Sequence, residues 1–271
     1  MIRLVCSSVV TRLRNKWAAG ETAFGGWCTM GSPFAAELMG ESGFDYVCVD
    51  LQHGLSDFEL GWQLVQALRA TNATPIVRVP YNHTPWPGKA LDAGAEAVVV
   101  PMVNSRAEAE AAVAACRYAP EGVRSYGPVR SGLLADSDPV AVNRYVLCLC
   151  MIETVRAVEA ADEICATPGV DGIYIGPADL AVSLSGTTSA MGSKEHADAI
   201  EVVRKACGAH GIKAGIHTSG GAQSRAFAKQ GFDMCTLATD ATLLRNMMRA
   251  ELQTARGSDP ARESESKDPY R

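Results

Sequence analysis

The sequence predicts an α/β protein built as a closed (β/α)8 barrel, the TIM-barrel fold. Eight short apolar runs alternate with helix-like segments, which is typical of parallel strands joined by crossover helices. The length of 271 residues and the hydrophobic fraction of 47% suit a single barrel. The rival is a doubly wound dinucleotide-binding fold. That fold needs a glycine-rich turn between an early strand and its helix, and the sequence has no such fingerprint.

The expected elements alternate regularly along the chain. The expected strands span residues 24–29, 46–50, 75–79, 97–101, 146–152, 172–175, 213–216 and 234–238. The expected helices span residues 34–42, 58–70, 86–93, 106–118, 155–166, 197–210, 222–230 and 241–255. Residues 119–143 form the longest irregular segment, and a loop of this length is typically functional or mobile.

The two ends of the chain differ in composition from the barrel, which we place at residues 21–256. Residues 1–20 carry four basic side chains before the first acidic one, a feature shared with organelle transit peptides. We favour instead an N-terminal helical segment whose apolar face, with Leu13 and Trp17, closes the bottom of the barrel. Residues 257–271 are polar and charged, so we expect a disordered tail there.

Composition limits the partners and the compartment. The net charge of −5 and the pI of about 5.6 argue against nucleic acid and anionic membranes, because both need a concentrated basic surface. No apolar run approaches the roughly 18 residues of a membrane-spanning helix. The nine cysteines form no CxxC motif, and several fall inside expected strands, which favours a reducing compartment. We therefore expect a cytoplasmic protein.

Polar residues stand where two early strands end. Asp50 and His53 follow the second strand, where a carboxylate can orient an imidazole. Arg78 lies among apolar residues in the third strand, and a buried guanidinium needs an anion to offset its desolvation. Because the C-terminal strand ends form the active face of this fold, all three are candidate catalytic residues. The alternatives are a structural ion pair for Arg78, with Asp50 or another acid, and a polar loop without chemistry for His53.

Two carboxylates follow the fifth and sixth strands. Glu153 comes directly after the first of these, and Asp179 lies four residues after the second. With no cysteine or histidine cluster beside them, they suit a hard divalent cation such as Mg²⁺ or Mn²⁺. The alternative is that each acid caps the helix-like segment that it precedes.

Other polar features give weaker signals. Arg124 is a candidate anchor for the long loop, and the Ser-Gly-Gly segment at 219–221 can offer backbone amides to an anion. Asp240 is expected to cap the final helix. Three histidines are expected on the surface, namely His83, His196 and His210.

Seven segments carry a resemblance to a known family. In chain order they are AELMGESGFDYVCVDLQHG, TPIVRVPYN, LDAGAEAVVVPMVNS, CRYAPEGVRSYG, IETVRAVEAADEI, GVDGIYIGPADLAVSLSG and FDMCTLATDATLL. Through them the chain resembles the HpcH/HpaI aldolases, which include 4-hydroxy-2-oxoheptanedioate aldolase and 2-keto-3-deoxy-sugar-acid aldolases. The resemblance implies a phosphoenolpyruvate/pyruvate-binding barrel and a class II aldolase. Such an enzyme makes and cleaves carbon–carbon bonds to pyruvate with a divalent metal (Mg²⁺, Mn²⁺ or Co²⁺).

The resemblance also implies roles for the polar residues at the strand ends. Glu153 and Asp179 correspond to the metal ligands of the family. Arg78 corresponds to the arginine that contacts the 2-oxo oxygen of the substrate. His53 and Asp50 correspond to a general-base pair.

Further implied roles concern the substrate and the assembly. The amide of Ala178, with that of the next residue, corresponds to the binding site for the pyruvate carboxylate. Asp92 corresponds to an acid that orders water across a subunit contact. Family members swap their C-terminal helix and form hexamers, so a homo-oligomer (a hexamer or trimer of dimers) is implied. Three positions depart from the family pattern: Met151 replaces a glutamine, His217 an apolar residue near the aldehyde, and Gln52 a glutamate.

The leading hypothesis is therefore an aldolase that acts on a 4-hydroxy-2-oxo acid and yields pyruvate and an aldehyde. One alternative is a citrate-lyase-like enzyme for acyl-CoA thioesters, which would need a basic patch for the CoA phosphates. Another is a catalytically degenerate barrel that acts as a binding subunit. Met151 favours this last alternative, and the retained acids, arginine and histidine oppose it. A Schiff-base aldolase needs a buried lysine, whereas Lys213 begins its strand at the wrong end of the barrel.

Overall fold

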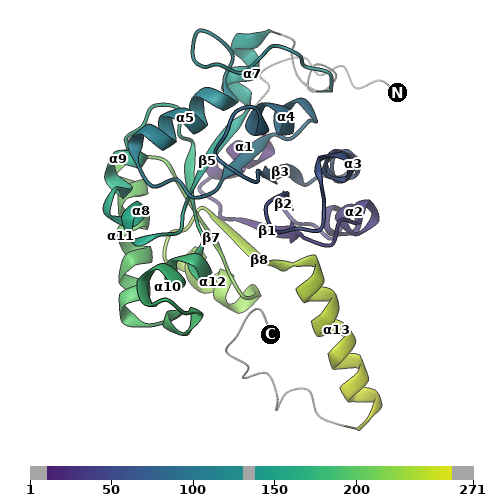
Figure 1. Ribbon diagram of the computed structural model, residues 1–271. Coiled ribbons are helices and arrows are strands. Elements are labelled where there is room, and N and C mark those ends of the chain that lie inside the picture. The colour runs from purple at the N-terminus through teal and green to yellow at the C-terminus, as the bar shows by residue number, and fades with distance from the viewer. Residues whose placement is uncertain (1–10, 131–137, 258–271) are drawn as a thin grey trace.

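Eight parallel strands close into a barrel, which confirms the expected fold (Figure 1). The computed structural model describes residues 11–130 and 138–257. Each strand pairs with the next in sequence, and β8 pairs with β1. The strands are β1 (Ala23–Cys28), β2 (Tyr46–Asp50), β3 (Thr74–Arg78), β4 (Ala97–Val100), β5 (Leu147–Ile152), β6 (Gly172–Ile175), β7 (Lys213–His217) and β8 (Met234–Thr239). The ends of all eight lie within one residue of those expected.

Helices surround the strands (Figure 1). They are α1 (Arg12–Ala18), α2 (Pro33–Glu41), α3 (Phe58–Arg69), α4 (Trp86–Asp92), α5 (Arg106–Cys116), α7 (Pro139–Tyr145), α8 (Val155–Glu159), α9 (Ala161–Cys165), α10 (Pro177–Ser185), α11 (Lys194–His210), α12 (Gly221–Lys229) and α13 (Asp240–Ala255), with a 3₁₀ turn at Thr188–Ala190. None of the helices in the described part of the chain has the length and apolar character to span a bilayer.

Three helical segments differ from the expectation. The helix expected at 155–166 divides into α8 and α9 at Ala160, whose ψ of 7° interrupts the helical backbone. The expected irregular segment 119–143 contains the start of α7, which the side chain of Asp138 caps and Pro139 opens. The structure also adds α10, which begins with Pro177 and ends at Gly186 in the left-handed conformation.

Side chains that point into the barrel form its inner core. Successive residues of a strand face opposite sides, so every second residue points inward. The inner cluster comprises Ala23, Trp27, Tyr46, Cys48, Ile76, Ala97, Val99, Leu147, Leu149, Met151, Tyr174 and Met234. Leu13 and Trp17 of α1 belong to the same cluster. The N-terminal half of the segment 1–20 and the tail beyond residue 257 lie outside the described residues.

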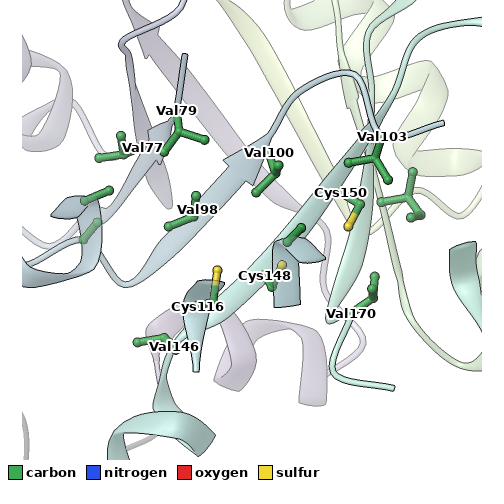
Figure 2. Close-up of a cluster of buried hydrophobic side chains, with 14 of the residues drawn as sticks. Val77, Val79, Val98, Val100, Val103, Cys116, Val146, Cys148, Cys150 and Val170 are labelled. Atoms are coloured by element: carbon green, nitrogen blue, oxygen red, sulfur yellow. The ribbon is translucent and has the colours of Figure 1, made fainter. Parts of the chain in front are cut away.

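Side chains that point outward pack against the helices. Figure 2 shows part of this layer, in which valines of β3 and β4 and cysteines of β5 lie near Cys116 of α5. The cysteines described by the structure are buried and form no disulfide. Burying such apolar side chains stabilises the barrel by roughly 1.5–3 kcal/mol for each larger residue. The two layers fix the register of each strand, and hence which strand-end side chains face the barrel axis.

Candidate active site

A cavity of about 300 Å³ opens at the C-terminal mouth of the barrel, where α/β barrels carry their active sites. It is lined by Trp27, Thr29, Asp50, His53, Arg78, Met151, Tyr174, Gly176, Pro177, Ala178, Asp179, His217 and Thr239. The two-residue repeat of a strand explains much of this set. Cys48, Ile76 and Leu149 point into the barrel, so the residues two positions later (Asp50, Arg78 and Met151) also face the axis. The cavity thus gathers most of the residues expected from the sequence.

Arg78 and Asp50 form a bidentate ion pair across β2 and β3. Arg78 donates from Nε to Asp50 Oδ1 at 2.9 Å and from Nη2 to Oδ2 at 2.6 Å. Trp27 Nε1 donates to Oδ2 at 3.1 Å. Burial alone would raise the pKa of Asp50, but the bonds from Arg78 hold it below its usual value. The structural pair considered for Arg78 is therefore present, and among the described residues the hydrogen-bond partner left to Nη1 is the Met151 sulfur at 3.9 Å.

His53 lies at the mouth of the cavity with an exposed side chain. Asp50 Oδ1 accepts the backbone N–H of His53 at 3.2 Å and that of Gln52 at 3.0 Å. Within residues 11–130 and 138–257, no hydrogen bond joins Asp50 to the imidazole. The expected orientation of the His53 ring by Asp50 is therefore not seen, because Arg78, Trp27 and two backbone amides already use the carboxylate.

Glu153 is buried beside Asp179, and its carboxylate is held by a backbone amide. Met102 N–H donates to Glu153 Oε1 at 2.8 Å. Burial, assisted by the Asp179 carboxylate, raises the pKa of Glu153 to about 7, although the Met102 bond opposes the shift. Met102 has a φ of 56°, a left-handed conformation that is costly for a side chain other than glycine. Asn104 Nδ2 donates to Met102 O at 2.7 Å and so stabilises this turn.

The junction between β6 and α10 brings Asp179 to the cavity. His196 is buried on α11, and its Nε2 lies 2.8 Å from the carbonyl oxygen of Pro177. This position corrects the expectation that His196 lies on the surface. The amides of Ala178 and Asp179 belong to the first turn of α10, where backbone N–H groups have no partner within the helix. Outside the helix neither amide has an acceptor among the described residues, so both are available to an anion.

The two carboxylates fit a hard divalent cation. The Asp179 carboxylate lies close enough to Glu153 to oppose ionisation of Glu153, and a bound cation would relieve that conflict. No group of three or more histidine, cysteine, aspartate or glutamate side chains suited to a metal occurs among the described residues. A bound cation would therefore take its remaining ligands from water and substrate.

Several residues expected near the site, Glu153 among them, lie outside the cavity lining. Gln52 contributes its backbone amide to Asp50, and its buried Oε1 has no partner among the described residues. Arg124 pairs with Asp92 at 2.5 Å and lies 4.4 Å from the centroid of the Tyr118 ring. These contacts attach the segment after α5 to α4.

Two further expectations concern the last two helices. Thr239 caps α13, whereas Asp240, expected as the cap, accepts the backbone N–H and hydroxyl of Thr29, both at 2.8 Å. The Ser219 amide donates to Gln223 Oε1 at 2.7 Å, so part of the 219–221 segment is already used.

Several residues of the site were not among those expected from the sequence. Trp27 and Tyr174 line the cavity. The alternation of side chains along β1 and β6 could have predicted that both point into the barrel. Met102 and His196 act on the site through their contacts with Glu153 and Pro177. No periodicity or motif indicates these two, because both contacts depend on loop conformation.

Comparisons with known proteins show similarity to one family over nearly the whole chain. The family model described as HpcH/HpaI aldolase/citrate lyase matches residues 24–247. The hydroxypyruvate/pyruvate aldolase of Rhizorhabdus wittichii is 36% identical over 91% of this chain and 99% of its own length. The 5-keto-4-deoxy-D-glucarate aldolase of Escherichia coli is 33% identical over 84% of this chain and 90% of its own length.

The fold comparison gives the same result. The crystal structure of an HpcH/HpaI aldolase/citrate lyase family protein from Burkholderia cenocepacia superposes with a TM-score of 0.85. It is 29% identical, and the match covers 91% of this chain and all of the other. Similarity therefore extends over the whole barrel and includes the strand ends that form the cavity. The chain belongs to the HpcH/HpaI aldolase/citrate lyase family.

Proposed function

We propose that the protein is a divalent-metal-dependent aldolase that interconverts a 4-hydroxy-2-oxo acid with pyruvate and an aldehyde. Family membership and the aldolase names of relatives over nearly the whole chain support a carbon–carbon lyase. The observation that carries the proposal is the cavity that Asp179 and Arg78 line together, with Glu153 buried beside Asp179.

Glu153 and Asp179 are the residues that would hold the cation, which we take to be Mg²⁺, Mn²⁺ or Co²⁺. When bound, the cation supplies Lewis-acid polarisation of the 2-oxo group of the substrate. The Met102 amide keeps the Glu153 carboxylate in place. His196 steadies the turn that carries Asp179 through its bond to Pro177.

The substrate carboxylate and 2-oxo oxygen have separate donors in the cavity. The free amides of Ala178 and Asp179 at the start of α10 receive the carboxylate. Arg78 Nη1 donates to the 2-oxo oxygen, and this bond strengthens as the oxygen becomes negative. Asp50 holds the guanidinium rigid, so the donor does not reorganise during the reaction. Met151 forms an apolar wall beside it.

His53 is the proposed base for the cleavage step. It takes the proton of the C4 hydroxyl, the C3–C4 bond breaks, and the aldehyde leaves. The electron pair of that bond forms the enolate of pyruvate, and His53 returns to C3 the proton that it has taken up. The exposed position of His53 at the mouth suits exchange of this proton with water.

The cavity lining opposes the acyl-CoA alternative. Binding of the CoA phosphates would need clustered basic side chains. Among the residues that line the cavity there is one arginine, already paired with Asp50, and no lysine. The degenerate-barrel alternative is opposed by the shared cavity of the arginine, the histidine and an acid.

We also propose that the chain forms a homo-oligomer through α13. This helix extends away from the barrel (Figure 1). Its side chains Leu243, Leu244, Met247, Met248 and Leu252 are exposed in the single chain. Apolar surface of this extent on a projecting helix is typical of a protein–protein contact.

Carbon–carbon bond formation from pyruvate and an aldehyde tests the proposal. We expect condensation with Mg²⁺ or Mn²⁺, complete loss with a chelator, and recovery when the metal is restored. Glu153→Gln should be inactive, whereas Glu163→Gln, on the exposed side of α9, should be unaffected. Borohydride with pyruvate should trap no lysine adduct. Full activity in chelator, or a trapped lysine, would contradict the metal-dependent assignment.

A further inference from the structure

His217, at the end of β7, is held in a fixed orientation in the cavity wall. Its Nδ1 lies 3.3 Å from the hydroxyl oxygen of Tyr174. The ring packs edge-on against Trp27, with centroids 5.4 Å apart and planes at 87°. Trp27 is itself fixed by its bond to Asp50. The imidazole is therefore a preorganised group facing the substrate space.

A buried chain of hydroxyl groups determines which ring nitrogen carries the proton. Tyr46 Oη lies 2.8 Å from Thr236 Oγ1, which lies 2.6 Å from Tyr174 Oη. If each hydroxyl donates toward His217, every hydroxyl proton has an acceptor and Nδ1 accepts the last bond. If Nδ1 donates instead, four protons share three hydrogen bonds, so one hydroxyl proton of this buried chain has no acceptor within it. A buried unpaired donor is costly, so the chain favours the tautomer with the proton on Nε2.

The surroundings keep this imidazole neutral. Burial and the charge of Arg78 lower the pKa of His217 to about 4, and Asp50 only partly offsets them. Trp27 on β1 and Tyr174 on β6 contact the ring, and Thr236 on β8 is the strand neighbour of His217. They carry no charge at neutral pH, since burial raises the pKa of Tyr174 well above its usual value.

The Nε2 atom of His217 opens on the cavity. It has no hydrogen-bond partner among the described residues. It is accessible from the cavity and is not buried inside the protein. We propose that His217 is a specificity-determining residue that donates a hydrogen bond from Nε2 to a hydroxyl oxygen on the substrate chain. The protein would then prefer hydroxylated substrates over deoxy analogues of equal length. This inference rests on the proposed aldolase function.

A hydroxyl group suits this position better than a second carboxylate. A carboxylate entering the cavity loses its hydration and needs a cation in return. Arg78 is the only permanently charged cation among the residues that line the cavity, and two of its nitrogens already donate hydrogen bonds to Asp50. A neutral imidazole supplies a directional donor without charge, which matches a neutral hydroxyl oxygen.

The test compares pairs of substrates of equal length. Pyruvate is condensed with glyceraldehyde and with propanal, and kcat/KM for glyceraldehyde is divided by kcat/KM for propanal. The intrinsic reactivities of the two aldehydes cancel when this ratio is compared between a variant and the wild type. His217→Leu should lower the ratio roughly fivefold to tenfold, the effect of one net hydrogen bond. His217→Gln keeps a donor near Nε2 and should stay within about twofold of the wild type. His210→Leu, at the end of α11, should leave the ratio unchanged.

A second pair, hydroxypyruvate and pyruvate with propanal as the common aldehyde, locates the hydroxyl. A selective loss in His217→Leu for the first pair places the hydroxyl on the aldehyde, and a loss for the second pair places it on the oxo acid. Either result supports the inference. Unchanged ratios in both pairs, with pyruvate still condensing with propanal, would overturn it and leave the aldolase function standing. A wild-type protein that condenses none of these substrates would instead overturn the aldolase function.

The tautomer can be measured without relying on any variant's activity. In protein labelled with ¹⁵N-histidine, the resonances absent from His217→Leu identify this ring. We expect a neutral imidazole protonated at Nε2 at neutral pH, and still neutral at about pH 5. A ring protonated at Nδ1, or charged at neutral pH, would contradict the inference.

Discussion

Arg78 divides its guanidinium between the protein and the proposed substrate. Nε and Nη2 bind Asp50, and Nη1 remains for the 2-oxo oxygen. A lysine has one compact ammonium group and cannot serve both. Arg78→Lys should therefore lower kcat/KM by roughly 10²-fold. Steady-state kinetics should show no such change for Arg69→Lys, whose side chain pairs with Glu96 at 2.5 Å. Near wild-type kinetics for Arg78→Lys would limit Arg78 to its ion pair.

Met151 presents a thioether where a polar side chain could contact the substrate. It is buried, and its sulfur lies 3.9 Å from Arg78 Nη1. Met151→Gln places an amide beside the proposed 2-oxo acid, so we expect a lower KM for pyruvate in the condensation direction. Steady-state kinetics with varied pyruvate would check this. An unchanged or higher KM would mean that the cavity already satisfies the oxo acid in another way.

The turn between β6 and α10 depends on the absence of a side chain at Gly176. A Cβ there would lie 2.6 Å from Met151 Cε and 2.7 Å from Glu153 Oε2. Both are ends of side chains, and the third contact, Glu153 Cβ at 3.0 Å, needs only a small shift, so Gly176→Ala should fold while displacing the Glu153 carboxylate. We expect the affinity for Mn²⁺, measured by calorimetric titration, to fall roughly 10–100-fold.

Gly208 is the matched control, since a Cβ on this residue of α11 would meet nothing within 4 Å. Gly208→Ala should bind Mn²⁺ as the wild type does and have equal or slightly higher thermal stability. Equal Mn²⁺ affinities in all three proteins would remove Glu153 from the proposed metal site.

At the scale of the whole molecule, α13 should join copies of the chain. Met247 and Met248 are 62% and 60% exposed in the single chain. By light scattering we expect a mass of six times the 28.7 kDa chain. Substituting Glu for both methionines should shift the protein toward smaller species, because the charges would be desolvated in an apolar contact. A wild-type protein of monomeric mass would contradict the proposed assembly.

The barrel follows from local sequence information. Short apolar runs and turn residues locate the eight strands, and the two-residue period then predicts that Asp50, Arg78 and Met151 share the barrel axis. Side chains alternate between the two faces of a strand, so the position of a residue along the strand largely determines where its side chain lies in the barrel. This is why most of the cavity could be predicted.

The contacts that orient the site could not be predicted in the same way. The bond from Met102 to Glu153 requires a left-handed residue, and that from His196 to Pro177 joins two helices. Several donors compete for the Asp50 carboxylate. Only the folded geometry determines that Arg78, and not the His53 ring, donates to it. These outcomes depend on non-local packing, which has no periodic signature.

Exchange of the methyl protons of pyruvate with heavy water tests the central claim most directly, because it needs no aldehyde. An aldolase of the proposed kind must form the pyruvate enolate, so the wild type with divalent metal should incorporate deuterium into pyruvate. Glu153→Gln should abolish this exchange, and His53→Ala should slow it by roughly 10²–10⁴-fold, as expected for loss of a positioned base. Absence of exchange in the wild type at saturating metal and pyruvate would contradict the account.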